Sequence, residues 1–260
     1  MSQGEVKIRV CTELKEWEQC VELQREVWGF SDLDLVPLRM FSVASKIGGQ
    51  VIGAYDGERM IGFALGIPGT RNGHLYLHSH MLAVVKDYQN QGLGRRIKLF
   101  QREDAVARGY ELMEWTFDPL EIKNAFLNLT KLGAIARRYN INQYGITSSP
   151  LQGFLPTDRL VAEWWLKSKR VGTLLSTGAL PAFETQVRIE VPGEIYAWKA
   201  KEETRAKAKE VQSRNRELFL DSFGRGLACL GYERDAQGNG AFLVGRWDEK
   251  WSYATGVDKE

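Results

Sequence analysis

Met81-Leu82-Ala83-Val84-Val85, followed after three residues by Gln89-Asn90-Gln91-Gly92-Leu93-Gly94-Arg95-Arg96, is the stretch that decides the fold. The first part ends a long strand expected over 75–85. The second opens a helix whose apolar residues recur at one-turn and two-turn spacing, as one helical face requires. A strand that runs through a glycine turn into a helix presents unpaired N–H groups and the positive end of the helix dipole. The stretch therefore predicts a site for a phosphate.

Two other phosphate-binding patterns are excluded in this turn. The dinucleotide fingerprint needs a third glycine, which would fall at Ile97, and the P-loop pattern G-x4-G-K-[ST] is absent. Glycines also suit an ordinary helix start with no ligand. The turn alone leaves both interpretations open.

Working outward, strands and helices alternate on both sides of this turn. Strands are expected at 6–10, 50–55, 60–67, 111–117, 160–166, 183–191, 228–232 and 241–246, and helices at 12–28, 38–46 and 118–132. Asp118 is expected as the N-cap of the last of these helices, with Pro119 at its first position. The charged stretch 194–223 is expected to form one long exposed helix. The pattern predicts a mixed α/β (α+β) fold with helices on both faces of a mixed sheet.

Composition bounds the partners. Lys and Arg number 35 against 33 Asp and Glu, a net charge of +2, which is too even to indicate nucleic acid or an acidic membrane. No apolar run approaches the ~20 residues of a spanning helix, and the first residues lack an apolar signal core. Three cysteines are too few for a disulfide framework. We expect a cytoplasmic protein without nucleic-acid or membrane partners.

The stretch from Met81 to Gly94 resembles the acyl-CoA signature of the GNAT superfamily of N-acyltransferases, in which [RQ]-x-x-G-x-[GA] follows a strand ending in L-x-V. Lys131-Leu132-Gly133 resembles that superfamily's second motif, about forty residues further on. Segments at 144–145, 153–159 and 163–165 resemble a poorly characterised bacterial subgroup of predicted GNAT proteins. The likeness covers roughly residues 5–167. It implies a GNAT-like acyl-CoA-binding domain over 1–167, with 168–260 as a C-terminal helix-and-strand extension that can pack on it.

The resemblance assigns acetyl-CoA or another acyl-CoA to named positions. The backbone of the strand end would pair with the pantetheine arm, as an added strand would. The glycine turn would hold the pyrophosphate on its N–H groups. The positions implied for the cofactor are Leu82, Ala83, Val84, Gln89, Gln91, Gly92, Leu93, Gly94, Arg95 and Arg96.

Three residues are candidates for catalysis. Direct transfer needs a base to take the proton of the amine. The superfamily often places one four residues before the position of Leu82, which here is His78, and His80 lies on the same face if the strand is regular. Glu114, on the next strand, is the third candidate because it could bind a cationic amine. Either histidine could instead be a structural residue. The two could also form a His-x-His zinc pair, but no carboxylate or cysteine lies nearby in sequence to complete such a site, so no metal is expected.

One position departs from the family pattern. Leu129 stands where many members have a tyrosine that protonates the leaving thiolate, and leucine has no proton to give. Tyr139 or Tyr144 could substitute, or the thiolate could leave unassisted.

The sequence therefore predicts transfer of an acetyl or other acyl group to a small-molecule or peptide amine. The rival hypothesis, favoured by Leu129, is a CoA-binding regulatory protein with little turnover. The extension could shape the acceptor pocket or cover a neighbouring subunit in a homodimer, and the sequence leaves both open.

Overall fold

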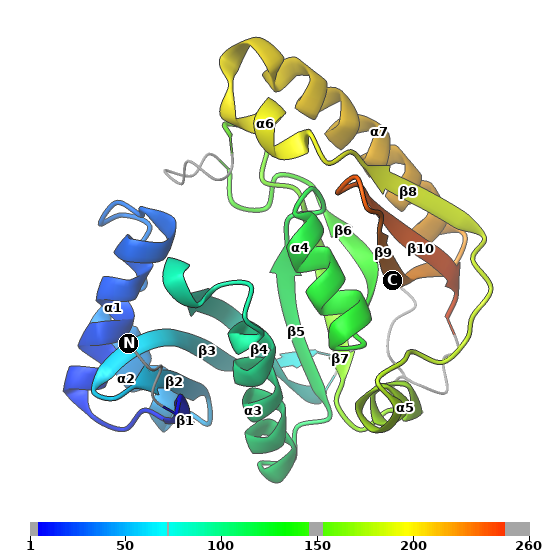
Figure 1. Cartoon of the computed structure of the whole chain (residues 1–260). Coiled ribbons are helices and arrows are strands. Elements are labelled where there is room, and N and C mark those ends of the chain that lie inside the picture. The colour runs from blue at the N-terminus through cyan, green and yellow to red at the C-terminus, as the bar shows by residue number, and fades with distance from the viewer. Residues whose placement is uncertain (1–4, 72, 146–152, 248–260) are drawn as a thin grey trace. The chain divides into compact units, whose positions relative to one another are not determined.

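The computed structural model describes residues 5–71, 73–145 and 153–247. The chain divides into two compact units, Met1–Met113 and Glu114–Glu260, called unit 1 and unit 2 below. Figure 1 labels their helices and strands. Within the described residues, no helix has both the length and the apolar character needed to cross a membrane.

Unit 1 is an antiparallel sheet with helices packed on it. Its elements are β1 (Lys7–Val10), α1 (Leu14–Trp28), α2 (Leu38–Lys46), β2 (Gln50–Asp56), β3 (Arg59–Arg71), β4 (His74–Val84), the 3-10 turn η1 (Lys86–Tyr88) and α3 (Leu93–Ala107). The strands pair in chain order from β1 to β4. A hairpin turn that contains Gly57, at φ 60°, joins β2 to β3. The elements expected in this part of the chain are thus confirmed.

Neighbouring residues of β3 show that the helices cover both faces of this sheet. Phe63 lies against Trp28 and Phe41, with ring centroids 6.2 and 5.8 Å away, so its face carries α1 and α2. A side chain at Gly62 would point the other way, to within 3.0 Å of Ile97 on α3. Since successive strand residues point to opposite faces, α3 lies on the face away from α1 and α2.

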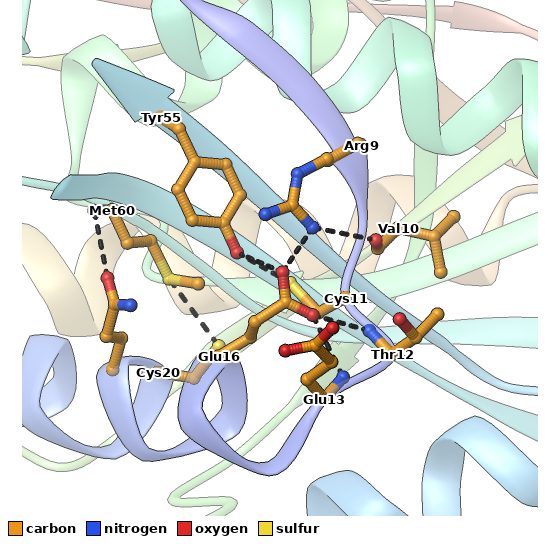
Figure 2. A network of polar contacts seen from close by, with 10 residues as sticks. Arg9, Val10, Cys11, Thr12, Glu13, Glu16, Cys20, Tyr55 and Met60 are labelled. Atoms are coloured by element: carbon orange, nitrogen blue, oxygen red, sulfur yellow. Dashed lines mark hydrogen bonds and ion pairs between the residues drawn. The ribbon is translucent and has the colours of Figure 1, made fainter. Parts of the chain in front are cut away.

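A polar cluster joins the end of β1 to the start of α1 (Figure 2). The Glu16 carboxylate accepts hydrogen bonds from the backbone N–H groups of Thr12 and Glu13, at 2.7 and 2.9 Å. It also accepts from the Tyr55 hydroxyl at 3.0 Å and pairs with Arg9. Burial would raise the pKa of Glu16, but these donors together lower it. The cluster fixes the entry into α1.

Unit 2 also consists of strands and helices, and β5 (Leu112–Phe117) crosses the division between the units in the sequence. The other elements are α4 (Ile122–Ala125), the π-helical turn η2 (Phe126–Lys131), β6 (Ile135–Asn140), β7 (Arg159–Trp165), α5 (Lys169–Thr177), β8 (Val187–Val191), α6 (Ile195–Ala200), η4 (Glu202–Thr204), α7 (Arg205–Gly224), β9 (Leu227–Arg234) and β10 (Gly240–Arg246). The strands lie in the order β5-β7-β6-β9-β10-β8.

Aromatic packing and one buried ion pair attach α7 to this sheet. Phe219 of α7 meets Phe242 of β10 edge to face, with ring centroids 5.0 Å apart. Asp158 is fully buried, and its carboxylate lies 2.8 Å from Arg216 of α7. The same carboxylate accepts a hydrogen bond from the Tyr139 hydroxyl at 2.7 Å. Asp158 therefore joins the extension to β6 and does not pair with the Arg159 side chain, which donates instead to the Asp158 carbonyl.

The segment 118–132 differs from its prediction. Asp118 caps no helix: its side chain accepts from the Leu120 N–H in a turn, at 2.8 Å, and α4 begins only at Ile122. Beyond Ala125 the chain continues as the π-helical turn η2. The reason is tertiary. The Thr130 hydroxyl donates to the carbonyl of Tyr232 and accepts from its N–H, at 2.7 and 3.0 Å, so β9 fixes this turn.

The prediction of one long exposed helix over 194–223 is also wrong. The chain breaks into α6, η4 and α7, and α7 buries Ala208 and Phe219 against the sheet. One strand and one α-helix had no prediction. They are β6, whose sequence contains two adjacent arginines, and α5, which runs from a Ser168 cap to Gly178.

Candidate functional site

The glycine turn has the backbone that its sequence predicts. Gly92 is the N-cap of α3 with φ 80° and ψ 0°, and Asn90 is also left-handed at φ 59°. Only glycine adopts this conformation without steric cost. The chain thus leaves β4, passes through η1 and enters α3 with the first N–H groups of that helix unpaired within it.

Side chains of the turn mostly brace it. The Gln89 amide donates to the Val84 carbonyl at 2.9 Å, and the Gln91 amide donates to the Asp87 carbonyl at 2.7 Å. Arg96 donates to the Val6 carbonyl at 2.9 Å. The Leu93 side chain is buried in the core. For most of the predicted cofactor positions, the group left for a ligand is therefore the backbone N–H.

The charge and space at this helix start fit a pyrophosphate. Helices usually favour acidic side chains in the first turn, but α3 has none there and carries Arg95 and Arg96. A Cβ added at Gly92 would meet no atom within 4 Å, and one at Gly94 would meet only Leu82 and Val84, at 3.8 and 4.0 Å. The turn is open above the end of β4, so an anion can approach its backbone closely.

The predicted strand end is formed by Leu82, Ala83 and Val84, opposite Ala64, Phe63 and Gly62 of β3. Ala83 is fully buried and Leu82 and Val84 are half-buried. Their side chains are apolar and largely packed in the domain. What this strand offers a cofactor is its backbone, as the resemblance implies.

The two candidate histidines of β4 lie at a β-bulge, on either side of Ser79. Met81 pairs with Leu65 and Ser79 with Gly66, so His80 is the extra residue with no partner opposite. The rings of His78 and His80 are nevertheless neighbours, with centroids 6.0 Å apart and an interplanar angle of 38°. Surrounding protein atoms partly desolvate the His80 ring and lower its pKa. His74 lies at the other end of the strand. Among the described residues, no group of His, Cys, Asp and Glu side chains is arranged to hold a metal ion.

Glu114, the third candidate, lies in unit 2 and is buried with 2% exposure. Its carboxylate pairs with the Arg138 guanidinium, which also lies 3.2 Å from Glu163. Arg137 pairs with Glu163 from the same bulge of β6, at 3.0 Å. The charge of Glu114 is thus already met by an arginine of its own unit. Sequence reasoning missed these two arginines, although their adjacency inside a strand is the signal.

The positions considered for a proton donor lie in unit 2. Leu129 is fully buried in η2. The Tyr139 hydroxyl is held by Asp158, and burial raises the pKa of this tyrosine. Tyr144 is exposed, and its hydroxyl lies 2.9 Å from the Thr116 hydroxyl. Of the two tyrosines, Tyr144 is the accessible one.

Unit 2 also contains a cavity of about 630 Å³ beside β8, β9 and β10. Three arginines line it, but so do three acidic residues: Arg188 pairs with Glu233, and Asp235 holds the turn residue Asn239. This balance of charge selects neither an anion nor a cation.

Comparison with known proteins matches one segment of the chain to a family. Residues 13–127 match the family described as "Acetyltransferase (GNAT) family". This segment, 115 of the 260 residues, is therefore similar to GNAT acetyltransferases. The resemblance stated from the motifs is thus confirmed, and so is acyl transfer from an acyl-CoA as the class of activity. No curated protein matches the sequence significantly.

Solved structures show the same fold. One is yncA, a putative acetyltransferase from Salmonella typhimurium with its cofactor acetyl-CoA; it is 16% identical with a TM-score of 0.50, over 62% of this chain and 94% of that chain. Another is smu.2055 from Streptococcus mutans UA159, also 16% identical with a TM-score of 0.50, over 62% and 99%. At this identity the likeness concerns the fold alone, and the predicted mixed α+β class is confirmed.

Proposed function

We propose that the protein transfers an acetyl or other acyl group from acyl-CoA to a small-molecule or peptide amine by direct attack. One observation carries the proposal. Within the segment that matches the family, Gly92 starts α3 at φ 80° directly after β4, with arginines and no acidic residue in the first turn. That is a backbone anion site at the end of a strand.

Two segments of unit 1 bind different parts of acyl-CoA. The N–H groups of 91–95 hold the pyrophosphate, and the backbone of 82–84 pairs with the pantetheine arm. The Arg96 N–H is already used, because it donates to the Gly92 carbonyl at 3.1 Å. The bound acyl-CoA supplies a thioester carbonyl as the electrophile. Gln89 keeps the turn closed on the strand by its hydrogen bond to the Val84 carbonyl.

The histidines of β4 supply the base. His78 accepts the proton of the amine, directly or through water, because an imidazole titrates near neutral pH. Burial by surrounding atoms lowers the pKa of His80, which favours the neutral form of its ring beside His78. We give Glu114 a supporting part only, since Arg138 already neutralises it.

A second function is favoured by Leu129. Leu129 is buried in η2, and its side chain has no proton to donate to the leaving thiolate. This suits a CoA-binding regulatory protein with little turnover. Tyr144 is the accessible replacement in the enzyme hypothesis.

CoA release from acetyl-CoA across a panel of amines separates the two functions. The enzyme hypothesis predicts release with at least one amine, and a loss of about 10²-fold or more in His78→Gln. His74→Gln, a change of the same kind at the far end of β4, is the matched control and keeps full activity. Tight acetyl-CoA binding with no release for any amine would support the regulatory function.

Location and assembly belong to the same proposal. All three cysteines are free, buried thiols, which suits a reducing compartment such as the cytoplasm. We propose that the protein has no nucleic-acid or membrane partner. We also propose that it assembles as a homodimer, which analytical ultracentrifugation at micromolar concentration tests.

A further inference from the structure

Three buried polar side chains form a closed triangle under the bulge of β4. Ser79 is 4% exposed, Lys98 of α3 is 2% exposed and Gln101 of α3 is fully buried. The Lys98 ammonium nitrogen lies 2.8 Å from the Ser79 hydroxyl and 3.2 Å from the Gln101 amide oxygen. The Ser79 hydroxyl donates to the same amide oxygen at 2.9 Å. Each member of this triangle, called the Lys98 triad below, contacts the other two.

Neighbouring residues leave space for this triad and extend its hydrogen bonds. Gly66 stands opposite Ser79 across the sheet, and a Cβ there would press on Gln101 Nε2 at 3.3 Å. Gln50 extends the network: its amide donates to the Gln101 carbonyl at 3.0 Å and to Asp104 at 2.6 Å. The Ser79 hydroxyl and the Gln101 amide oxygen are thereby held in one arrangement.

Stability does not explain the Lys98 triad. Burial lowers the pKa of Lys98 well below its ordinary value, because the charged form loses its water. Apolar groups of the same shape would fill this space without that cost. A buried polar network of this kind fixes one local geometry. A functional role is therefore to be sought in the segment that the network holds in place.

The feature held here is the stretch between the two candidate histidines. Ser79 lies directly between His78 and His80, at the point where the strand bulges. Its hydroxyl is bound from α3, so the backbone on both sides of it cannot rotate freely. The separation and tilt of the two rings follow from that backbone.

We propose that Ser79, Lys98 and Gln101 are positioning residues that hold the β4 bulge and thereby set the placement of His78 and His80 for proton transfer. This inference rests on the proposed function for its catalytic meaning. Lys98 and Gln101 face this strand from α3, and Gln50 of β2 links Gln101 to Asp104.

The test uses the histidines as their own reporters. The chain has three, so imidazole NMR spectra of the full-length protein contain three sets of ring signals. Lys98→Met and Ser79→Ala are each expected to move the chemical shifts and titration curve of His78, His80 or both, and to leave His74 in place. Gln24→Leu is the control: it removes an equally buried amide, whose bonds run to Val36.

Folding is checked separately. Because the folded pKa of Lys98 is lowered, the unfolded chain binds more protons between that pKa and about 10.4, and wild-type stability rises with pH over that window. Lys98→Met removes this cost, so its unfolding temperature should exceed that of the wild type at pH 7, by an amount that shrinks toward pH 10. If Ser79→Ala fails to fold, Lys98→Met decides alone.

Turnover gives the second readout. With an accepted amine, Lys98→Met should lower kcat about tenfold or more and shift its pH profile, while KM for acetyl-CoA stays within about twofold. The inference would be overturned if folded Lys98→Met and Ser79→Ala proteins gave the same His78 and His80 titration curves as the wild type. It would also be overturned if Gln24→Leu shifted these curves as much as the triad variants do. The NMR titration needs no turnover, so its failure is distinct from failure of the proposed function, which acetyl-CoA binding and CoA release test.

Discussion

The glycine turn of unit 1 and the segment 118–131 of unit 2 both had clear sequence signals, but only the first has the expected structure. At the turn, Gly92 takes the left-handed backbone that its position required. In the second segment, Asp118 caps no helix and η2 replaces a regular helix. The first conformation is determined by residues within the turn itself. The second is determined by contacts with residues about 80 and 100 positions away, Lys199 and Tyr232.

The difference shows which part of a site can be derived from sequence. A positive φ is a local property that glycine permits wherever it stands. A π-helical turn gains nothing locally and persists only where tertiary contacts favour it. The cofactor side of the site is therefore the more predictable one, and the departure at Leu129 lies in the part shaped by distant contacts.

The largest effect expected from breaking those distant contacts is at Lys199. This buried ammonium lies 3.0 Å from Asp118 and 2.9 Å from Glu121. Lys199→Met leaves the buried Asp118 carboxylate without its ion-pair partner, and we expect a loss of about 3–5 kcal/mol in the free energy of unfolding. Lys201→Met, at an exposed position nearby, should stay within about 0.5 kcal/mol. Equal losses in urea unfolding of the two variants would contradict this account.

The ion pairs of Lys199 also make the stability of the protein depend on pH. Burial alone would lower the pKa of Lys199, but the charges of Asp118 and Glu121 raise it overall. A raised folded pKa contributes stability that is present below the unfolded value of about 10.4 and is lost as pH rises through the folded value. The deficit of Lys199→Met relative to wild type should therefore narrow above about pH 10.4.

A smaller loss is expected at Thr130, which ties η2 to β9. Thr130→Val keeps the shape but leaves the N–H and carbonyl of Tyr232 without this partner, at a cost of about 1–3 kcal/mol. Thr130→Ser keeps the hydroxyl and should unfold close to the wild type. A valine variant as stable as the serine variant would mean that other contacts maintain the π-helical turn.

The smallest effect sharpens the description of the glycine turn. Gly94 has no positive φ, and its added Cβ makes only ordinary contacts. Gly94→Ala should gain up to ~1 kcal/mol from helix propensity and still bind acetyl-CoA, as the family pattern with Gly or Ala here implies. Loss of binding in a stable Gly94→Ala protein would place the pyrophosphate closer to this residue than we describe.

The comparison also explains which elements could be predicted. The strands and helices of unit 1 follow from hydrophobic periodicity and turn glycines, as with α2 and the hairpin at Gly57. The break of 194–223 and the pairing of Asp158 with Arg216 depend on partners far along the chain. The bulge at His80 and the Lys98 triad were missed for a similar reason. Alternation predicts a regular strand, and a lysine next to Ile97 in a helix is ordinarily solvent-exposed.

Thermal unfolding with ~1 mM acetyl-CoA tests the central claim, that the left-handed turn at Gly92 is the cofactor site. If the Kd is about 10 μM, saturation adds ~2.7 kcal/mol, a rise on the order of 5–10 °C. Gly92 and Gly109 flank α3 with φ 80° and 87°, and an added Cβ meets no atom within 4 Å at either. Alanine at each should cost a similar ~1 kcal/mol of backbone strain.

The account predicts that Gly92→Ala loses the acetyl-CoA shift, whereas Gly109→Ala keeps the full shift from a similarly lowered baseline. An undiminished shift in Gly92→Ala, or none in the wild-type protein, would contradict it.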